Sequence, residues 1–152
     1  YAAGLRLLQS VLMTANRGGL EMAKHAELIV QQNDLDQFAP PGHGGTVNVR
    51  LAGKEFCDAF EMLLGTVVPG GEAEPHSHET EHQIIYILKG RAEVTLGDDP
   101  TVICGPGTVI RIPPKLEHGI VAVGEEDYQC VIIYSPPLPK REEVLVDEKR
   151  PL

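Results

Sequence analysis

The sequence has no apolar run of the roughly 18–20 residues that a membrane-spanning helix requires. It also lacks an excess of positive charge, because 13 Lys and Arg stand against 22 Asp and Glu, for a formal net charge of −9. A chain without a basic patch is unsuited to nucleic acid, and an acidic surface repels anionic membranes. These absences favour a protein that acts on small molecules, with no nucleic-acid or membrane partner.

Cysteine is scarce, and the three that occur, Cys57, Cys104 and Cys130, include no C-x-x-C pair. An odd number without that spacing predicts reduced thiols in a cytoplasmic protein. Each cysteine lies in or beside an apolar stretch, as expected of a small side chain in the core.

From residue 46 onward the chain reads as short strands separated by Gly- and Pro-containing turns, one of them Pro69-Gly70-Gly71. Such spacing predicts an all-β fold, an antiparallel barrel or sandwich, and 152 residues suit one domain. The predicted strands are Thr46–Leu51, Ala59–Val68, Gln83–Leu88, Ala92–Leu96, Thr101–Cys104, Val109–Ile112, Gly119–Val123 and Gln129–Tyr134.

The predicted strand Gln83–Leu88 is apolar on both faces. Alternation puts Gln83, Ile85 and Ile87 on one face and Ile84, Tyr86 and Leu88 on the other. A barrel buries its inner face, whereas the outer face needs a second layer. A homodimer would supply that layer, and a sandwich packed within the chain explains the pattern equally well.

The two ends of the chain are expected to lie outside the barrel of residues 46–135. Residues 1–45 form an N-terminal arm, helix and loop, with helical periodicity that includes Glu21–Val30. Since Met22 offers a start, residues 1–21 are expected to be a loosely packed or non-native extension; a short helix covering the barrel or a partner is the alternative. Residues 136–152 form an extended tail, docked by the apolar residues 144–146.

Three of the six histidines cluster at His76, His78 and His82. Residues two apart on a strand share a face, so His76 and His78 can bind one metal ion. The alternative is a pair of solvent-exposed histidines in a loop. A turn returns Gln83 beside them, and His118 heads a later predicted strand.

The segment from Gly70 to Gly90 resembles the first cupin motif, G-x5-H-x-H-x4-E-x6-G, with Gln83 in place of the usual Glu. The segment from Gly105 to His118 resembles the second motif, with Pro114 or Lys115 at the place of a usual glycine. The resemblance covers residues 46–135.

This resemblance implies a cupin jelly-roll-like antiparallel β-barrel with a short helical N-terminal segment. It also implies one divalent metal ion, Mn, Fe, Ni, Co or Zn, held by the matching residues His76, His78, Gln83 and His118. Glu81 and His82 are rival fourth ligands, although strand parity points His82 to the other face and leaves Glu81 in the turn.

A neutral ligand set leaves the charge of the ion uncompensated, which strengthens it as a Lewis acid and favours anionic chelating substrates. The Gln-bearing motif is similar to that of small cupins that convert unsaturated uronates to keto sugars in pectin breakdown. The expected function is therefore a metal-dependent isomerase, lyase or decarboxylase acting on a small hydroxy- or keto-acid or sugar acid.

Two other functions stay open: a non-haem iron dioxygenase and a non-catalytic cupin that binds a small ligand. The candidate acid–base residues are Glu81, Tyr86 and Glu117, with Glu74, Glu79 and Tyr134 also near the motifs. Arg50, Arg91 or Arg111 could hold a substrate carboxylate. His43 lies in a glycine-rich segment, expected to be a flexible loop that could close over the barrel mouth.

Overall fold

The computed structural model describes residues 25–140, 143–146 and 149, and the chain divides into two units, residues 1–31 and 32–152. The described helical structure is limited to two short 3-10 turns, η1 (Ala26–Leu28) and η2 (Gln32–Asp34). Within the described ranges, no helix has the length and apolar character needed to cross a membrane. The helix predicted over Glu21–Val30 is wrong in its described part, because the backbone is already extended at Ile29. The expectations for residues 1–21 lie outside the described residues.

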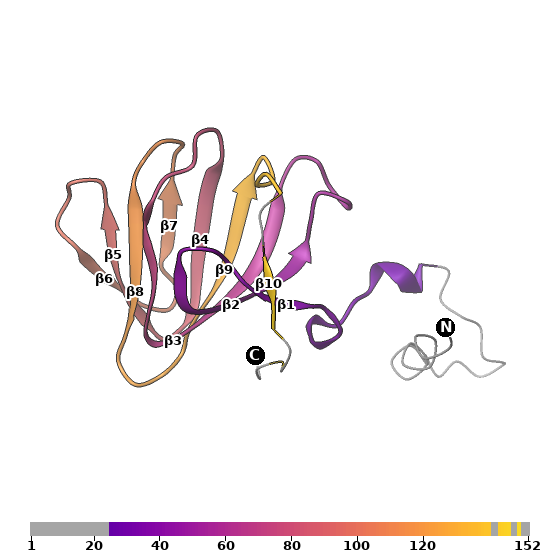
Figure 1. Cartoon of the computed structure of the whole chain (residues 1–152), viewed down its shortest axis with the longest axis horizontal. Helices are drawn as coiled ribbons and strands as arrows, with labels where there is room; N and C mark the ends of the chain where they lie inside the picture. The colour runs from indigo at the N-terminus through magenta and orange to yellow at the C-terminus, as the bar shows by residue number, and fades with distance from the viewer. Residues whose placement is uncertain (1–24, 141–142, 147–148, 150–152) are drawn as a thin grey trace. The chain divides into compact units, whose positions relative to one another are not determined.

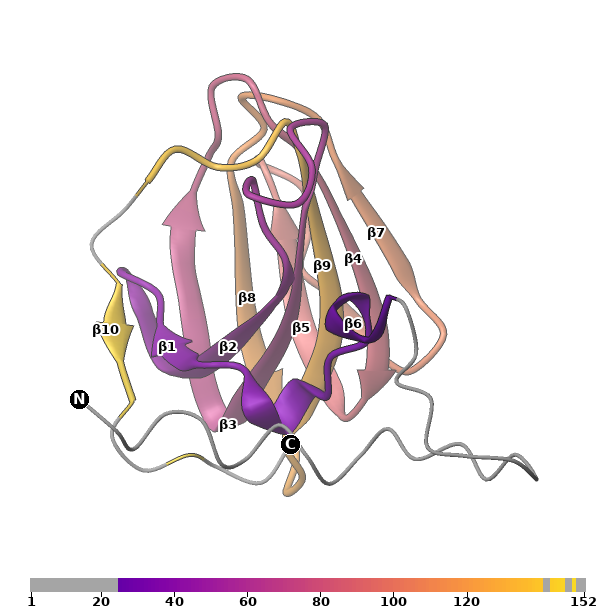
Figure 2. The same ribbon diagram turned by 90° about the vertical axis from the view of Figure 1, so that its right-hand side faces the viewer.

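The second unit is almost entirely β-structure, as the sequence predicted, and it curls into a half-barrel (Figures 1 and 2). Every strand pairing among the described residues is antiparallel. The strands are β1 (Gln37–Ala39), β2 (His43–Ala52), β3 (Glu61–His76), β4 (His82–Lys89), β5 (Arg91–Leu96), β6 (Val102–Cys104), β7 (Val109–Ile112), β8 (His118–Val123), β9 (Tyr128–Ser135) and β10 (Val144–Leu145).

Strand β3 belongs to both walls of the half-barrel. Its first part, Glu61–Val67, pairs with β9, which continues to β4 and β7. Its second part pairs with β8, which continues to β5 and β6. The turn predicted at Pro69–Gly71 is therefore wrong: the strand bends there and continues. Gly70 has a φ of +76°, and a Cβ on Gly71 would lie 2.8 Å from the carbonyl oxygen of Gly44, so the bend depends on glycine.

The interior follows the alternation of the strands, most clearly in β4. Gln83, Ile85 and Ile87 are 4%, 1% and 0% exposed and face the interior. The opposite face carries Ile84, Tyr86 and Leu88, which are 41–44% exposed. The described part of the chain therefore does not cover this outer face, which rules out the packing of a sandwich within the described chain as its cover.

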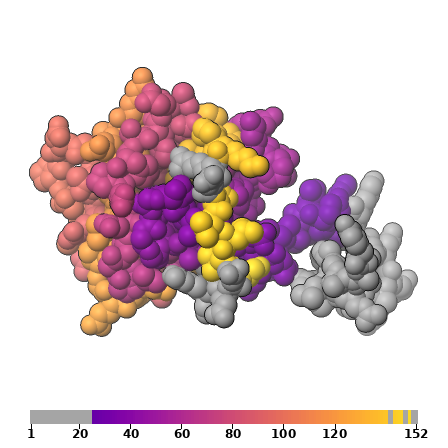
Figure 3. All heavy atoms as spheres, in the orientation of Figure 1, coloured from indigo at the N-terminus to yellow at the C-terminus, as the bar shows by residue number. Residues whose placement is uncertain are grey.

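The sheet extends beyond the predicted strands at both ends. Strand β1 pairs with β2 on one side and with β10 on the other, so the tail is docked, as expected. Figure 3 shows the yellow C-terminal segment lying against the indigo N-terminal part of the barrel. The reason given for docking was wrong, because Val144 and Leu145 stay 69% and 63% exposed. Backbone pairing and the ion pair from Arg50 to Glu143 hold the tail instead.

Candidate metal centre

Three imidazoles meet where strands β3 and β8 pair. His76 ends β3 and is the register partner of His118 at the start of β8, while His78 lies two residues further along the loop. The ring centroids are 4.4 Å apart for His76 and His118, 5.0 Å for His76 and His78, and 5.4 Å for His78 and His118. One nitrogen from each ring lies within 4.8 Å of the others, which suits ligation of a single ion.

The loop before β8 is tied to the loop after β3. The backbone N–H of Lys115 donates a hydrogen bond to the carbonyl oxygen of His78, at 2.7 Å. Lys115 has a φ of +68°, the left-handed region that favours glycine, so Lys115 rather than Pro114 takes the conformation expected of the glycine in the second motif. This contact fixes His78 relative to His118.

Backbone carbonyls set the orientation of two of the rings. The Nδ1–H of His76 donates to the carbonyl oxygen of Glu74 at 2.6 Å, and that of His118 donates to Leu116 at 2.9 Å. In each ring Nε2 then carries the lone pair. The Nε2 of His118 is buried and has no hydrogen-bond partner among the described residues. Burial lowers the pKa of His118 more than its bond to Leu116 raises it, which favours the neutral ring that a metal requires.

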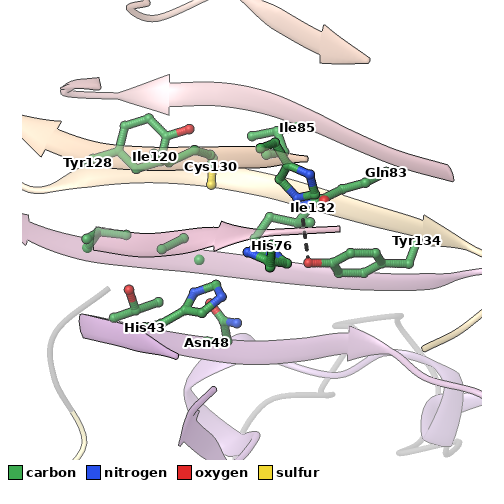
Figure 4. Close-up of a pocket in the computed structure, with 15 residues that line it drawn as sticks. His43, Asn48, His76, Gln83, Ile85, Ile120, Tyr128, Cys130, Ile132 and Tyr134 are labelled. Atoms are coloured by element: carbon green, nitrogen blue, oxygen red, sulfur yellow. Dashed lines mark hydrogen bonds between the residues drawn. The ribbon is translucent and has the colours of Figure 1, made fainter. Parts of the chain in front are cut away.

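Gln83 lines the same cavity as His76 and His118. Its Nε2 donates to the hydroxyl of Tyr134 at 3.1 Å, and its buried Oε1 has no hydrogen-bond partner among the described residues (Figure 4). The ring of Tyr134 also meets that of His78 edge-on, at 5.2 Å between centroids. Three imidazole nitrogens and one amide oxygen fit a divalent transition-metal ion.

The rival ligands are placed differently. His82 is exposed on the opposite face of β4. Glu81 is buried, and its carboxylate accepts hydrogen bonds from the backbone N–H and hydroxyl of Thr80, at 3.3 and 2.9 Å. Burial alone would raise the pKa of Glu81, but the bonds from Thr80, a backbone hydrogen bond of its own and the nearby His78 hold it below its usual value. Its carboxylate is therefore already satisfied outside the cavity that Gln83 lines.

A cavity of about 40 Å³, partly open to solvent, begins at His76 and His118 and runs into the barrel. His43 is half-buried at the start of β2, with its ring 5.6 Å from that of His76, so it belongs to a strand rather than to the predicted loop. No Asp, Glu, Lys or Arg is found among the described residues of the wall. The lining residues are His43, Thr46, Asn48, Gly65, Val67, Ala73, His76, Gln83, Ile85, His118, Ile120, Tyr128, Cys130, Ile132 and Tyr134.

The cupin domain family matches residues 63–134 of this chain. The structure of the polyketide cyclase RemF from Streptomyces resistomycificus is 30% identical, with a TM-score of 0.61, covering 80% of this chain and 86% of that one. This chain belongs to the cupin family. KdgF from Halomonas sp. is 26% identical over 68% of this cupin and 86% of that chain, with a TM-score of 0.59.

A curated relative of this cupin, the polyketide synthase CurC of Streptomyces cyaneus, is 31% identical over 90 residues, or 59% of this chain. The matched region spans only 58% of that relative and 62% of a second curated relative, from Methanocaldococcus jannaschii. Both matches are therefore partial, and they bear on the barrel rather than on the whole of either relative.

Several other predicted site residues do not line the cavity of this cupin. Tyr86 has the opposite strand parity to Gln83 and is 44% exposed, so its expected role beside the metal is wrong. Glu117 is adjacent to His118 but exposed. Arg50 is held by Glu61 and Glu143. The other two arginines, Arg91 and Arg111, are exposed.

The sequence analysis missed the polar residues deeper in the cupin barrel, which include Thr46, Asn48 and Tyr128. A signal was present for two of them, because Thr46 and Asn48 alternate with Val47 and Val49 in a strand that is buried on both faces. A polar side chain on a buried strand face needs a hydrogen-bond partner, so such a residue can be recognised in the sequence as a candidate site residue.

Proposed function

We propose that this cupin binds one divalent metal ion through His76, His78, Gln83 and His118 and acts as a Lewis-acid enzyme on a small carbonyl or hydroxy-acid compound. The observation that carries the proposal is that ligand nitrogens of His76, His78 and His118 lie within 4.8 Å of one another, at a cavity that Gln83 also lines. Mn, Fe, Ni, Co and Zn all accept such donors. The reaction class is an isomerase, lyase or decarboxylase, as the resemblance implied.

The bound ion would supply polarisation of a substrate carbonyl and stabilisation of negative charge that develops on its oxygen. The protein orients the side chain of Gln83. The Tyr134 hydroxyl accepts a hydrogen bond from the amide Nε2 of Gln83, so the amide oxygen of Gln83 points away from Tyr134. His43 is the residue best placed to carry a proton, since it lines the cavity and neighbours His76. The apolar walls, such as Ile85 and Ile120, exclude water from the reacting groups.

The charge of the cavity wall limits the class of substrate that can bind. Because no charged side chain is found among its described residues, a substrate carboxylate has to lie at the metal ion. The rest of the substrate then has to be uncharged. The similarity to a polyketide cyclase supports chemistry at carbonyl groups, and the similarity to KdgF accords with the Gln-bearing motif.

The decisive experiment is metal analysis of the untagged protein, purified without added metal, together with proton exchange. We expect near-stoichiometric metal in the wild type and little in a His76→Ala, His118→Ala double variant. The metal-loaded protein should accelerate deuterium incorporation beside the carbonyl of some members of a panel of keto acids and hydroxyketones in D₂O, read by NMR. A Val102→Ser variant, changed at an exposed position on β6, should match the wild type.

Three results would contradict this proposal. Absence of metal from the wild type, with no binding on titration, removes the metal centre. Iron in the protein with substrate-dependent oxygen consumption assigns the dioxygenase function instead. Ligand binding to the metal-loaded protein without exchange or other turnover assigns the non-catalytic function.

We also propose that a second copy of the chain covers the outer face of β4. Ile84, Tyr86 and Leu88 are 41–44% exposed there, and Val109 on the paired strand β7 is 52% exposed. A contiguous exposed apolar surface is typical of a protein interface. Sedimentation should find a homodimer that Tyr86→Glu converts to a monomer, whereas a monomeric wild type at micromolar concentration would contradict the proposal.

A further inference from the structure

A second group of polar side chains lines the same cavity as His76 and His118. Thr46 and Asn48 on β2 and Tyr128 on β9 are 7%, 4% and 1% exposed, and all three line the cavity. Asn48 and Tyr128 are labelled on its wall in Figure 4. Thr46 Oγ1 and Asn48 Oδ1 have no hydrogen-bond partner among the described residues, and the Tyr128 hydroxyl has only the weakly bonding thiol of Cys130 beside it. We refer to these three residues as the inner polar cluster.

Strand register explains why these side chains face one cavity. Thr46 pairs with Val67, which pairs with Tyr128, so the two hydroxyl-bearing residues stand in one row across β2, β3 and β9. Asn48 stands in the adjacent row, opposite Gly65. A Cβ on Gly65 would lie 3.1 Å from Asn48 Oδ1, so the absence of a side chain there leaves room beside the amide.

The metal centre does not account for the inner polar cluster. Its ligands come from the end of β3, the following loop and the starts of β4 and β8, whereas Thr46 and Asn48 lie within β2. A buried polar group without a partner destabilises a folded protein. Two such groups facing one cavity, with the Tyr128 hydroxyl on the same wall, therefore indicate a ligand that completes their hydrogen bonds.

The chemistry of the cluster selects the ligand group. Asn48 Oδ1 requires a donor, while the Thr46 and Tyr128 hydroxyls can each donate or accept. A ligand hydroxyl satisfies both needs, because it donates to the amide and accepts from a hydroxyl. A carboxylate would bring a buried charge to a wall that has no Lys or Arg among its described residues.

The neighbouring groups are also uncharged. Burial raises the pKa of the Tyr128 hydroxyl well above its usual value, and it raises the pKa of the adjacent Cys130 thiol to about 12. Neither group supplies a negative charge for a ligand cation. The cluster is therefore a neutral hydrogen-bonding site.

We propose that the inner polar cluster binds an uncharged hydroxyl of the same ligand whose oxygen atoms occupy the metal centre. This inference rests on the proposed function for the metal end of the ligand. It assigns the substrate class as compounds with a chelating hydroxy-carbonyl or hydroxy-acid group at one end and a neutral hydroxyl, sugar-like or phenolic, at the other.

The first test uses three hydroxypyranones that share one metal-chelating hydroxyketone and differ in a single distant substituent. Kojic acid carries a hydroxymethyl group, allomaltol carries a methyl group and comenic acid carries a carboxylate at the same ring position. Calorimetric titration of the zinc-loaded protein should find kojic acid about 5-fold tighter than allomaltol, as one net hydrogen bond allows. Comenic acid should bind more weakly than kojic acid.

The variant Thr46→Val, Asn48→Leu removes the polar groups of two of the three cluster residues and keeps the number of side-chain heavy atoms. Kojic acid should then bind only as tightly as allomaltol, and the allomaltol affinity should change less than twofold. Equal affinities for kojic acid and allomaltol in the wild type would overturn the proposal. So would tighter binding of comenic acid than of kojic acid.

The second test needs no metal. Buried polar groups that lack a hydrogen-bond partner until a ligand binds destabilise the ligand-free protein. Thr46→Val and Asn48→Leu should therefore each raise Tm by about 2–4 °C. Thr66→Val is the matched control, because Thr66 is a buried threonine on β3 whose hydroxyl accepts a hydrogen bond from Gln129 at 3.4 Å. A fall in Tm for both cluster variants, as for the control, would assign them a structural role and overturn the proposal.

The two tests separate this inference from the proposed function. Failure of the metal ion and of all three hydroxypyranones to bind would refute the metal centre, and the Tm values of the cluster variants would still decide whether Thr46 and Asn48 are held for a ligand. Binding of allomaltol as tightly as kojic acid would refute the hydroxyl site while leaving the metal centre intact.

Discussion

The metal centre and the inner polar cluster are both buried polar groups in one cavity, yet they arise in different ways. The metal centre is built at strand ends, with His76 closing β3, His118 opening β8 and Gln83 near the start of β4. The inner polar cluster is built within strands, where Thr46 and Asn48 replace the apolar residues that a barrel interior normally requires.

This difference affects how each site is stabilised. At strand ends, backbone carbonyls are free to bond side chains, and Glu74 and Leu116 accept from the two histidine rings. Inside the sheet the backbone is engaged in strand pairing, and Thr46 Oγ1 and Asn48 Oδ1 find no hydrogen-bond partner among the described residues. The rings of the proposed metal centre are therefore oriented by the protein alone, whereas the hydrogen bonds of the inner polar cluster would depend on the proposed ligand.

The largest expected effect is on metal affinity, which should depend on His118 and hardly on Asn48. His118→Ala should weaken metal binding by at least about 100-fold, because a primary ligand matters more than the outer partners whose loss costs 10–100-fold. Asn48→Leu should change it less than about threefold. Competition with a chromogenic chelator measures both. A large loss in Asn48→Leu would show that the two sites are energetically coupled.

The next prediction concerns the charge of the metal centre. Gln83→Glu adds a carboxylate beside the ion, so metal affinity should rise by about 10-fold, equivalent to about 1.4 kcal/mol. Without metal the buried carboxylate should lower the free energy of unfolding by about 1–3 kcal/mol. Chelator competition and urea unfolding test the two halves, and Gln83→Leu serves as the control that should weaken metal binding.

A third prediction follows from the lowered pKa of His118. Because the unfolded chain takes up the proton first, near the ordinary histidine pKa of 6.5, stability is fully present above that pH and declines as pH falls below it toward the lower folded pKa. The metal-free protein should therefore lose Tm between pH 7 and pH 5. The loss should be smaller in His118→Asn, and equal slopes in both proteins would contradict the assignment.

The smallest expected effect is a change in stability on substitution of Lys115, in the loop before β8 that bonds to His78. The backbone of Lys115 has a left-handed conformation, which strains a residue with a side chain. Lys115→Gly therefore removes about 1–2 kcal/mol of backbone strain but adds about 0.5–1 kcal/mol to the entropic cost of folding. The net gain should raise Tm by about 1–3 °C and leave metal affinity unchanged. Lys115→Ala, which keeps the strain, should show no such rise.

Most of the barrel could be predicted from local patterns. The alternation in Gln83–Leu88 placed Gln83 inward and Ile84 outward, as the exposures confirm. The bend at Gly70 was mistaken for a turn because glycine permits both, and only the pairing of β3 with both β8 and β9 distinguishes them. Strands β1 and β10 escaped prediction because two or three residues carry too little pattern to identify a strand.

By itself, the sequence determined the all-β architecture and the spacing of His76, His78, Gln83 and His118, because alternation and motif spacing are local properties of the chain. Only the tertiary structure decided which side chains share the cavity. It excluded Tyr86 by strand orientation, brought His43 beside His76, and placed Thr46, Asn48 and Tyr128 together. Those neighbours depend on the register of β2, β3 and β9, which is fixed by packing between segments far apart in the chain.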